Sequence, residues 1–230
     1  MQDNRDAAGP AHRPPSFERS TNPLVRKLES LAPLSAADRM VLEEISADSY
    51  HVEPRTDLIR EGDAPSGVFL IMDGTACRYK VRASGARQIM AFLVAGDLCD
   101  LDVALLMEMD HSIATLSACQ VVRLRIETVT DLVDNHPAIA RALRLATLVD
   151  EATLREWLLN VGRRTSEERI AHLLCELLLR LQAVGRATKG SYEIPFLQSD
   201  LADTTGLSKV HVNRSLHNLC LLYTSDAADE

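Results

Sequence analysis

The sequence predicts an α+β fold, in which an antiparallel β-sandwich or roll is followed by helices. Two observations carry this prediction. From residue 50 to residue 126, short apolar stretches alternate with turn glycines, whereas after Pro137 the apolar residues recur at helical spacing. The chain has 230 residues, 46% of them hydrophobic and 25% charged, which allows one large domain or two smaller ones with a proper core.

The N-terminal residues 1–22 are polar and proline-rich, and we interpret them as a disordered arm. They hold no apolar segment of a secretory signal, and no run in the chain approaches the roughly 20 residues of a membrane helix. We therefore expect a cytoplasmic protein with no membrane partner. The five cysteines form no CxxC pair, so we interpret them as small buried hydrophobes and expect no metal site.

The first half of the chain passes from helices to strands. Residues 23–47 carry two helical patterns, the second of them capped by Ser35. The stretch 67–74 is a short apolar strand, residues 77–81 alternate between apolar and polar, and 88–97 runs back after a turn. Glycines stand at the breaks between these strands, where a positive φ costs glycine little.

Residues 138–162 predict one helix, which would be about 37 Å long. Its broad stripe of small and aliphatic residues includes Leu145, Val149 and Ala152. A stripe of this length suits a parallel helix pair between two copies of the chain. A rod that packs only on its own domain is the alternative.

The C-terminal third predicts a helix opened by Ser166, a short strand over 191–196, and a helical hairpin over 197–219. In the hairpin, Gly206 makes a tight turn and Ser208 caps the second helix. That helix would project donor side chains outward with no acid among them: Lys209, His211, Asn213, Arg214 and His217. Arginine can bind guanine bidentately and asparagine can bind adenine, so the pattern indicates a DNA-binding surface.

Three motifs follow one another along the chain, at residues 60–81, 95–106 and 200–216: REGDAPSGVFLIMDGTACRYKV, AGDLCDLDVALL and DLADTTGLSKVHVNRSL. In this order and spacing the chain resembles the Crp/Fnr family of transcription regulators over about residues 23–219. The resemblance implies a double-stranded β-helix (jelly-roll-like) sensor domain over 23–136, a dimerisation helix over 137–162 and a winged helix-turn-helix domain over 163–219. It further implies a homodimer that binds double-stranded DNA, with RNA polymerase as a candidate partner.

By the family pattern, Ser208, Lys209 and Arg214 match DNA-contacting positions. His211 and Asn213 are added because we expect them to be exposed.

The phosphate cassette of the cyclic-nucleotide-binding members is only partly kept. The candidate effector positions are Gly96, Asp97, Leu101, His111 and Ser112. The family's glutamate, which holds the ribose hydroxyl, is replaced by leucine, which cannot accept a hydrogen bond. Its arginine is replaced by histidine, a weaker phosphate partner. We therefore predict poor or no binding of cyclic AMP, and the effector stays unknown.

No cofactor is expected. The redox-sensing branch of the family carries an N-terminal cysteine cluster, and residues 1–50 contain no cysteine. Haem ligation by His51 or His111 has no support, because a lone histidine is usually structural.

The last residues, 220–230 (CLLYTSDAADE), resemble the conceptual translation of a sequencing-library adapter. We expect this tail to be artefactual and the family's β-hairpin wing to be missing. Without a wing, we expect exposed apolar surface around Leu216, Leu219 and Leu221, and weakened DNA binding by this exact chain.

Two other classes of protein compete with a DNA-binding regulator. A small-molecule-binding signalling module without DNA binding would need an intact phosphate cassette and no basic terminal helix. A cupin-type metal enzyme would need clustered histidines, and the seven histidines show no HxH. GxSxG and P-loop patterns are also absent from the sequence. We therefore predict that the protein is not an enzyme.

Overall fold

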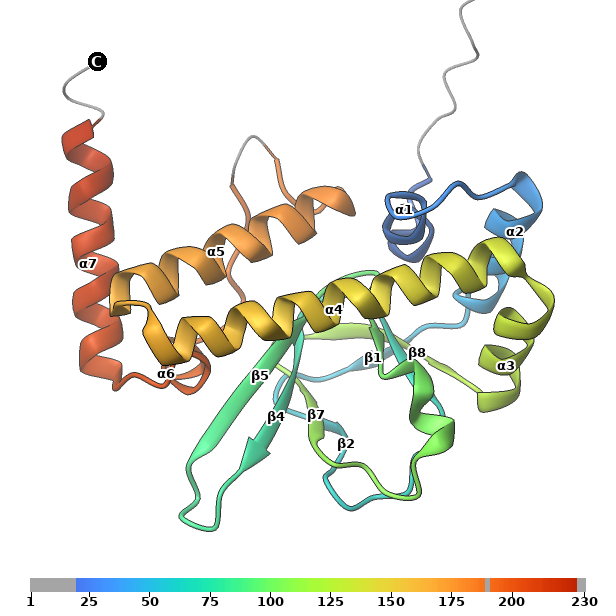
Figure 1. Cartoon of the computed structure of the whole chain (residues 1–230), viewed down its shortest axis with the longest axis horizontal. Helices are drawn as coiled ribbons and strands as arrows, with labels where there is room; N and C mark the ends of the chain where they lie inside the picture. Colours follow the sequence, from blue (N-terminus) through green and yellow to red (C-terminus); the bar gives the residue numbers. More distant parts are fainter. Residues whose placement is uncertain (1–19, 189–190, 227–230) are drawn as a thin grey trace, which may run out of the picture.

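The computed structural model describes residues 20–188 and 191–226 (Figure 1). The helices are α1 (Pro23–Glu29), α2 (Ala36–Ile45), α3 (Ile126–Asn135), α4 (Pro137–Arg163), α5 (Ser166–Ala183), α6 (Gln198–Thr205) and α7 (Lys209–Asp226), with a short 3-10 helix η1 (Leu101–Leu105). The strands are β1 (Tyr50–Val52), β2 (Asp57–Ile59), β3 (Val68–Asp73), β4 (Ala76–Val81), β5 (Arg87–Leu93), β6 (Leu98–Cys99), β7 (Ser112–Thr115) and β8 (Cys119–Leu124). This order confirms the predicted α+β fold.

The strands form two antiparallel four-stranded sheets, with the orders β1-β8-β3-β6 and β2-β7-β4-β5. The pairing is nested, because β1 pairs with β8, β2 with β7, β3 with β6 and β4 with β5. A chain folded in half and coiled in this way is a double-stranded β-helix, or jelly roll. The predicted roll is therefore confirmed.

Helices cover part of the roll and share its core. In β3, four successive residues from Val68 to Ile71 are buried, because one face of the strand meets the opposite sheet and the other meets helices. In α1, Leu24, Val25 and Leu28 are almost fully buried against the same cluster. The backbone of α1 lies so close that a Cβ on Gly96 would stand 2.6 Å from the carbonyl oxygen of Pro23.

Residues 20–22 of the predicted disordered arm lie in the described part of the chain, and they are held by contacts with the folded unit. Residues 1–19 lie outside the described part. Ser20 donates a hydrogen bond to Glu43, and the Asn22 side chain caps α1 by accepting from the backbone N–H groups of Leu24 and Val25. Ser20 and Asn22 therefore belong to the folded unit, and the Asn22 side chain satisfies donors at the start of α1.

Helix α4 runs from α3 along the roll to the C-terminal helices (Figure 1). Its first turns contribute Ile139 and Ala142, both fully buried, to the roll core. Near its end, Trp157 packs edge-on against Phe92 of β5, and its indole N–H donates to Glu176 of α5 at 2.5 Å. This helix thus contacts both the roll and the C-terminal domain.

The region 163–219 departs from prediction in three details. The cap of α5 is Thr165 and not Ser166, because Thr165 and Glu168 form a capping box. Residues 191–196 are not a strand. They have a single bridge, between Ser191 and Thr188, and the apolar Phe196 instead stacks on Phe92. The backbone of α7 continues as helix to Asp226, beyond the expected end at Leu219.

The cysteines are only partly the buried hydrophobes that we expected. Cys77, Cys99 and Cys119 are buried in the roll, whereas Cys175 and Cys220 are exposed on α5 and α7.

Candidate nucleic-acid interface and effector loop

The helix-turn-helix is formed by α6 and α7. Gly206 ends α6 with a φ of +69°, a left-handed conformation that glycine adopts without strain, and its N–H bonds the carbonyl of Ala202 at 3.0 Å. Two residues later, the Ser208 side chain accepts a hydrogen bond from the N–H of His211 at the start of α7. The predicted turn and the predicted cap are both confirmed.

The inner face of α7 is fixed to α5. Val212 is fully buried, and Ser215 and Asn218 both donate hydrogen bonds to Glu167 in the first turn of α5. Hydrogen bonds from Ser166, from the Glu167 backbone and from Asn218 lower the pKa of Glu167 to about 2. The carboxylate is therefore ionised at neutral pH, and it holds α7 at a set rotation about its axis.

The outer face of α7 carries the predicted DNA-contacting residues. All five are exposed: Ser208, Lys209, His211, Asn213 and Arg214. No acidic residue occurs in the sequence from Thr204 to Leu221. The prediction did not include Val210, whose side chain is 70% exposed in the same turn. Helical spacing from the buried Val212 could have placed it outward.

The apolar surface expected around the end of the hairpin is present in part. Leu221 is 55% exposed, whereas Leu216 and Leu219 are half-buried against the core of the C-terminal domain.

In the roll, the predicted effector residues Gly96 and Asp97 are occupied by contacts within the chain. Asp97 is buried and forms ion pairs with Lys27 of α1 at 2.6 Å and with Arg180 of α5 at 2.5 Å. Burial alone would raise the pKa of Asp97, but the charges of Arg180 and Lys27 outweigh it and lower the pKa to about 2. Asp97 therefore joins the roll to two helices.

The other predicted effector residues lie farther along the same loop. Both ring nitrogens of His111 contact carboxylates: Nε2 lies 3.0 Å from Asp100, and Nδ1 lies 2.7 Å from Asp110. Burial disfavours the charged ring, yet the two acids raise the pKa of His111 above its usual value. The Ser112 hydroxyl accepts from the backbone N–H of Glu61, and Leu101 packs half-buried against the roll core.

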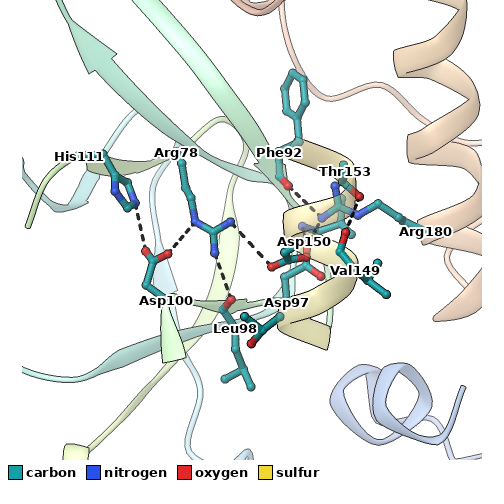
Figure 2. Close-up of polar contacts among 12 residues, drawn as sticks. Arg78, Phe92, Asp97, Leu98, Asp100, His111, Val149, Asp150, Thr153 and Arg180 are labelled. Carbon is teal, nitrogen blue, oxygen red and sulfur yellow. Dashed lines mark hydrogen bonds and ion pairs between the residues drawn. The ribbon is translucent and has the colours of Figure 1, made fainter. Parts of the chain in front are cut away.

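Sequence reasoning missed Arg78, the central residue of this region. Figure 2 shows its guanidinium between α4 and the segment from Asp97 to His111, which we call the cassette loop. Its Nε lies 3.1 Å from Asp100, one terminal nitrogen lies 3.9 Å from Asp150 of α4, and the other approaches the carbonyl of Leu98 at 3.5 Å. The residue alternates with apolar neighbours along β4, so the pattern indicated a solvated position. In the fold its side chain is only 16% exposed, because Asp100 and Leu98 lie on one side of it and α4 on the other.

A second polar cluster joins the roll to the helix-turn-helix. Asp200 of α6 is fully buried. Its carboxylate accepts hydrogen bonds from both terminal nitrogens of Arg55 at 2.7 Å, from a terminal nitrogen of Arg87 at 2.5 Å, and from the backbone N–H of Leu197. Arg87 also bonds Asp203 of the same helix at 2.8 Å. No sequence pattern marked this contact, because its partners lie more than 100 residues apart.

Two protein families match this chain. Residues 50–136 match the cyclic nucleotide-binding domain family, and residues 168–221 match the Crp-like helix-turn-helix domain family. A probable transcriptional activator of Rhizobium leguminosarum bv. viciae is 28% identical over 77% of this chain and 74% of its own length. The transcriptional activatory protein AadR of Rhodopseudomonas palustris is 26% identical over 88% of this chain and 83% of its own length.

Among solved structures, FixK2 from Bradyrhizobium japonicum superposes with a TM-score of 0.68 at 23% identity, covering 76% of this chain and 85% of that one. The roll, the long helix and the helix-turn-helix therefore define a two-domain transcriptional regulator with a DNA-binding domain. The chain belongs to the Crp/Fnr family, whose members are regulators of transcription and not enzymes. In the described residues, no helix is long and apolar enough to cross a membrane.

Proposed function

We propose that this regulator is a cytoplasmic homodimer that binds a near-palindromic DNA site through α7 and whose roll responds to an effector other than cyclic AMP. The observation that carries the proposal is the exposed edge of α7, which presents Lys209, Asn213 and Arg214 without an intervening acid. Cationic and amide donors on the N-terminal half of a second helix suit phosphates and base edges in the major groove.

The exposed apolar residues of α4 support the dimer. On one face of the helix Leu145 is half-buried and Ala152 exposed, while Leu148 is 44%, Val149 49% and Leu159 44% exposed. A single chain gains nothing from leaving such residues in water, and a second α4 laid parallel to the first would cover them. Two-fold symmetry then requires two recognition helices about 34 Å apart, one turn of DNA, and a palindromic site. RNA polymerase remains a candidate partner of the bound dimer.

The contacts around His111 support the exclusion of cyclic AMP. A nucleotide phosphate at this loop would meet the carboxylates of Asp100 and Asp110, and the guanidinium of Arg78 beside it is already paired with Asp100. Like charges at these distances oppose anion binding. In isothermal calorimetry we expect no heat of binding with cyclic AMP at micromolar concentrations. Low-micromolar binding would contradict this part of the proposal.

Ion pairs supply a route from the roll to the DNA-binding helices. Arg78 connects the cassette loop to Asp150 of α4, and Asp97 connects the same loop to Arg180 of α5. An effector that changed this loop would thereby change the packing of α4 and the aim of α7. This coupling is the hypothesis that links sensing to DNA binding.

DNA binding itself is tested by selecting duplexes from a random pool with the 230-residue chain at low salt, followed by mobility-shift titration of the winners. We expect enriched palindromic sites, and we expect Arg214→Ala to weaken binding by about tenfold or more, the loss of one base-edge contact. Arg125→Ala is the matched control, because Arg125 is 77% exposed at the start of α3 and bonds only Glu127 among the described residues. Failure to enrich any duplex would contradict the proposal.

A further inference from the structure

Val210 is an apolar side chain on an otherwise polar surface. It is 70% exposed, more than the exposed valines at 81, 133, 149 and 161. The other valine of α7, Val212, is fully buried, and the apolar residues of α6 are buried as well. Val210 therefore contributes nothing to the core of the helix-turn-helix. As a β-branched residue it is also a weaker helix former than alanine, so the local fold gives no reason for it.

Its position is that of a base-reading residue. Val210 is the second residue of α7, and Asn213, Arg214 and His217 follow it at spacings of three, four and seven, so all four share one exposed face. The N-terminal turn of a recognition helix is the part that reaches base edges in the major groove. The residues around Val210 are hydrogen-bond donors, which indicates that the surface they share with it meets an anionic, hydrogen-bonding partner.

Duplex DNA has one apolar group in its major groove, the C5-methyl of thymine. Apart from small C–H edges, the other features of the base edges there are hydrogen-bond donors or acceptors, which a valine cannot bind. We propose that Val210 contacts this methyl group, and that it thereby specifies a thymine at one position in each half-site. The proposal rests on DNA binding by α7 and adds to it which base this residue reads and by which atom.

The test uses deoxyuridine, which differs from thymidine only by lacking the methyl group. In the duplex selected by the chain, thymines at symmetric positions are replaced pair by pair with uracil, and affinity is measured by fluorescence anisotropy. We expect one symmetric pair at which the loss is about fourfold per half-site, or roughly fifteenfold for the dimer, as the burial of one methyl-sized group predicts.

The same scan on Val210→Ala completes the cycle. This variant should fold normally, because residue 210 is exposed and alanine favours helix. It should bind the thymine-containing site more weakly and lose most of the difference between thymine and uracil at that pair. Val81→Ala is the matched control, since it makes the same truncation on an exposed residue at the end of β4, far from α7 in the fold.

The outcomes separate the two proposals. If no duplex is enriched, DNA binding by this chain is wrong. If a site is bound but no thymine pair responds to loss of its methyl, or if Val210→Ala keeps the full response, Val210 does not read thymine. If Val210 instead contacts a protein partner, no thymine pair should respond to loss of its methyl group, and Val210→Ala should keep full affinity for DNA.

Discussion

The contact between the roll and the helix-turn-helix depends on one buried carboxylate, that of Asp200. Replacing it by asparagine keeps the size of the side chain but removes the charge that Arg55 and Arg87 share, and the amide can accept fewer of their hydrogen bonds. The two guanidiniums would then face each other across a neutral group. Removing one partner of a buried ion pair costs roughly 3–5 kcal/mol.

The cost here should be smaller, because the side chains of Arg55 and Arg87 are 38% and 26% exposed and water can solvate them in part. We expect a loss of about 2 kcal/mol in the free energy of unfolding, which lowers the melting temperature by roughly 4–8 °C for a chain of this size. Asp203→Asn is the control. Asp203 is 31% exposed and, among the described residues, pairs only with Arg87, so its loss should be under about 1 kcal/mol.

The assay is urea unfolding followed by circular dichroism, at neutral pH and in acid. Burial alone would raise the pKa of Asp200, but the hydrogen bonds from Arg55, Leu197 and Arg87 hold it below its usual value. A lowered pKa stabilises the fold above the unfolded pKa of about 3.9, and that stability is lost as pH falls through the folded value. The difference between wild type and Asp200→Asn should therefore shrink below about pH 4. An asparagine variant as stable as wild type at neutral pH would refute the reasoning.

Three further changes test other parts of the structure. Val149→Asp places a charge on the exposed stripe of α4. Sedimentation should show monomers, and mobility shifts should show that DNA binding is lost. DNA binding by monomers would contradict the hypothesis that dimerisation through α4 is needed for DNA binding. The raised pKa of His111 means that its stabilising charge is present below the unfolded pKa of about 6.5 and is lost as pH rises through the folded value. The destabilisation measured for His111→Gln should thus be greatest near about pH 6 and smaller near about pH 8.5, and an unchanged difference would refute it. A Cβ at residue 206 would meet no atom within 4 Å, so Gly206→Ala should cost only the strain of the left-handed φ. Urea unfolding should show a loss of about 1 kcal/mol in the free energy of unfolding. A loss above about 3 kcal/mol would show a steric clash instead.

Local sequence patterns were sufficient to predict most of the elements, although they did not predict α3. Alternation and turn glycines mark the strands, and Gly206 with Ser208 marks the turn and cap of the helix-turn-helix. The apolar run around Phe196 was wrongly predicted as a strand, because an isolated run of this length does not say whether it pairs with a strand or packs against an aromatic ring.

The polar contacts between distant elements were not predictable from the sequence. Arg78 alternates as an exposed strand residue would, yet it lies between Asp100 of the roll and Asp150 of α4. Asp200 has the spacing of an ordinary helix cap, and its arginine partners come from turns and strands more than 100 residues away. Long-range partners of this kind leave no periodic signal, so charge patterns alone could not separate them from solvated residues.

The central claim, that α7 binds duplex DNA through its cationic edge, is tested most directly by the salt dependence of affinity for the selected duplex. We expect the logarithm of the association constant to fall linearly with the logarithm of salt concentration, and Lys209→Ala to reduce this slope by about one per subunit. Affinity that does not change with salt, or a slope that Lys209→Ala leaves unaltered, would contradict it.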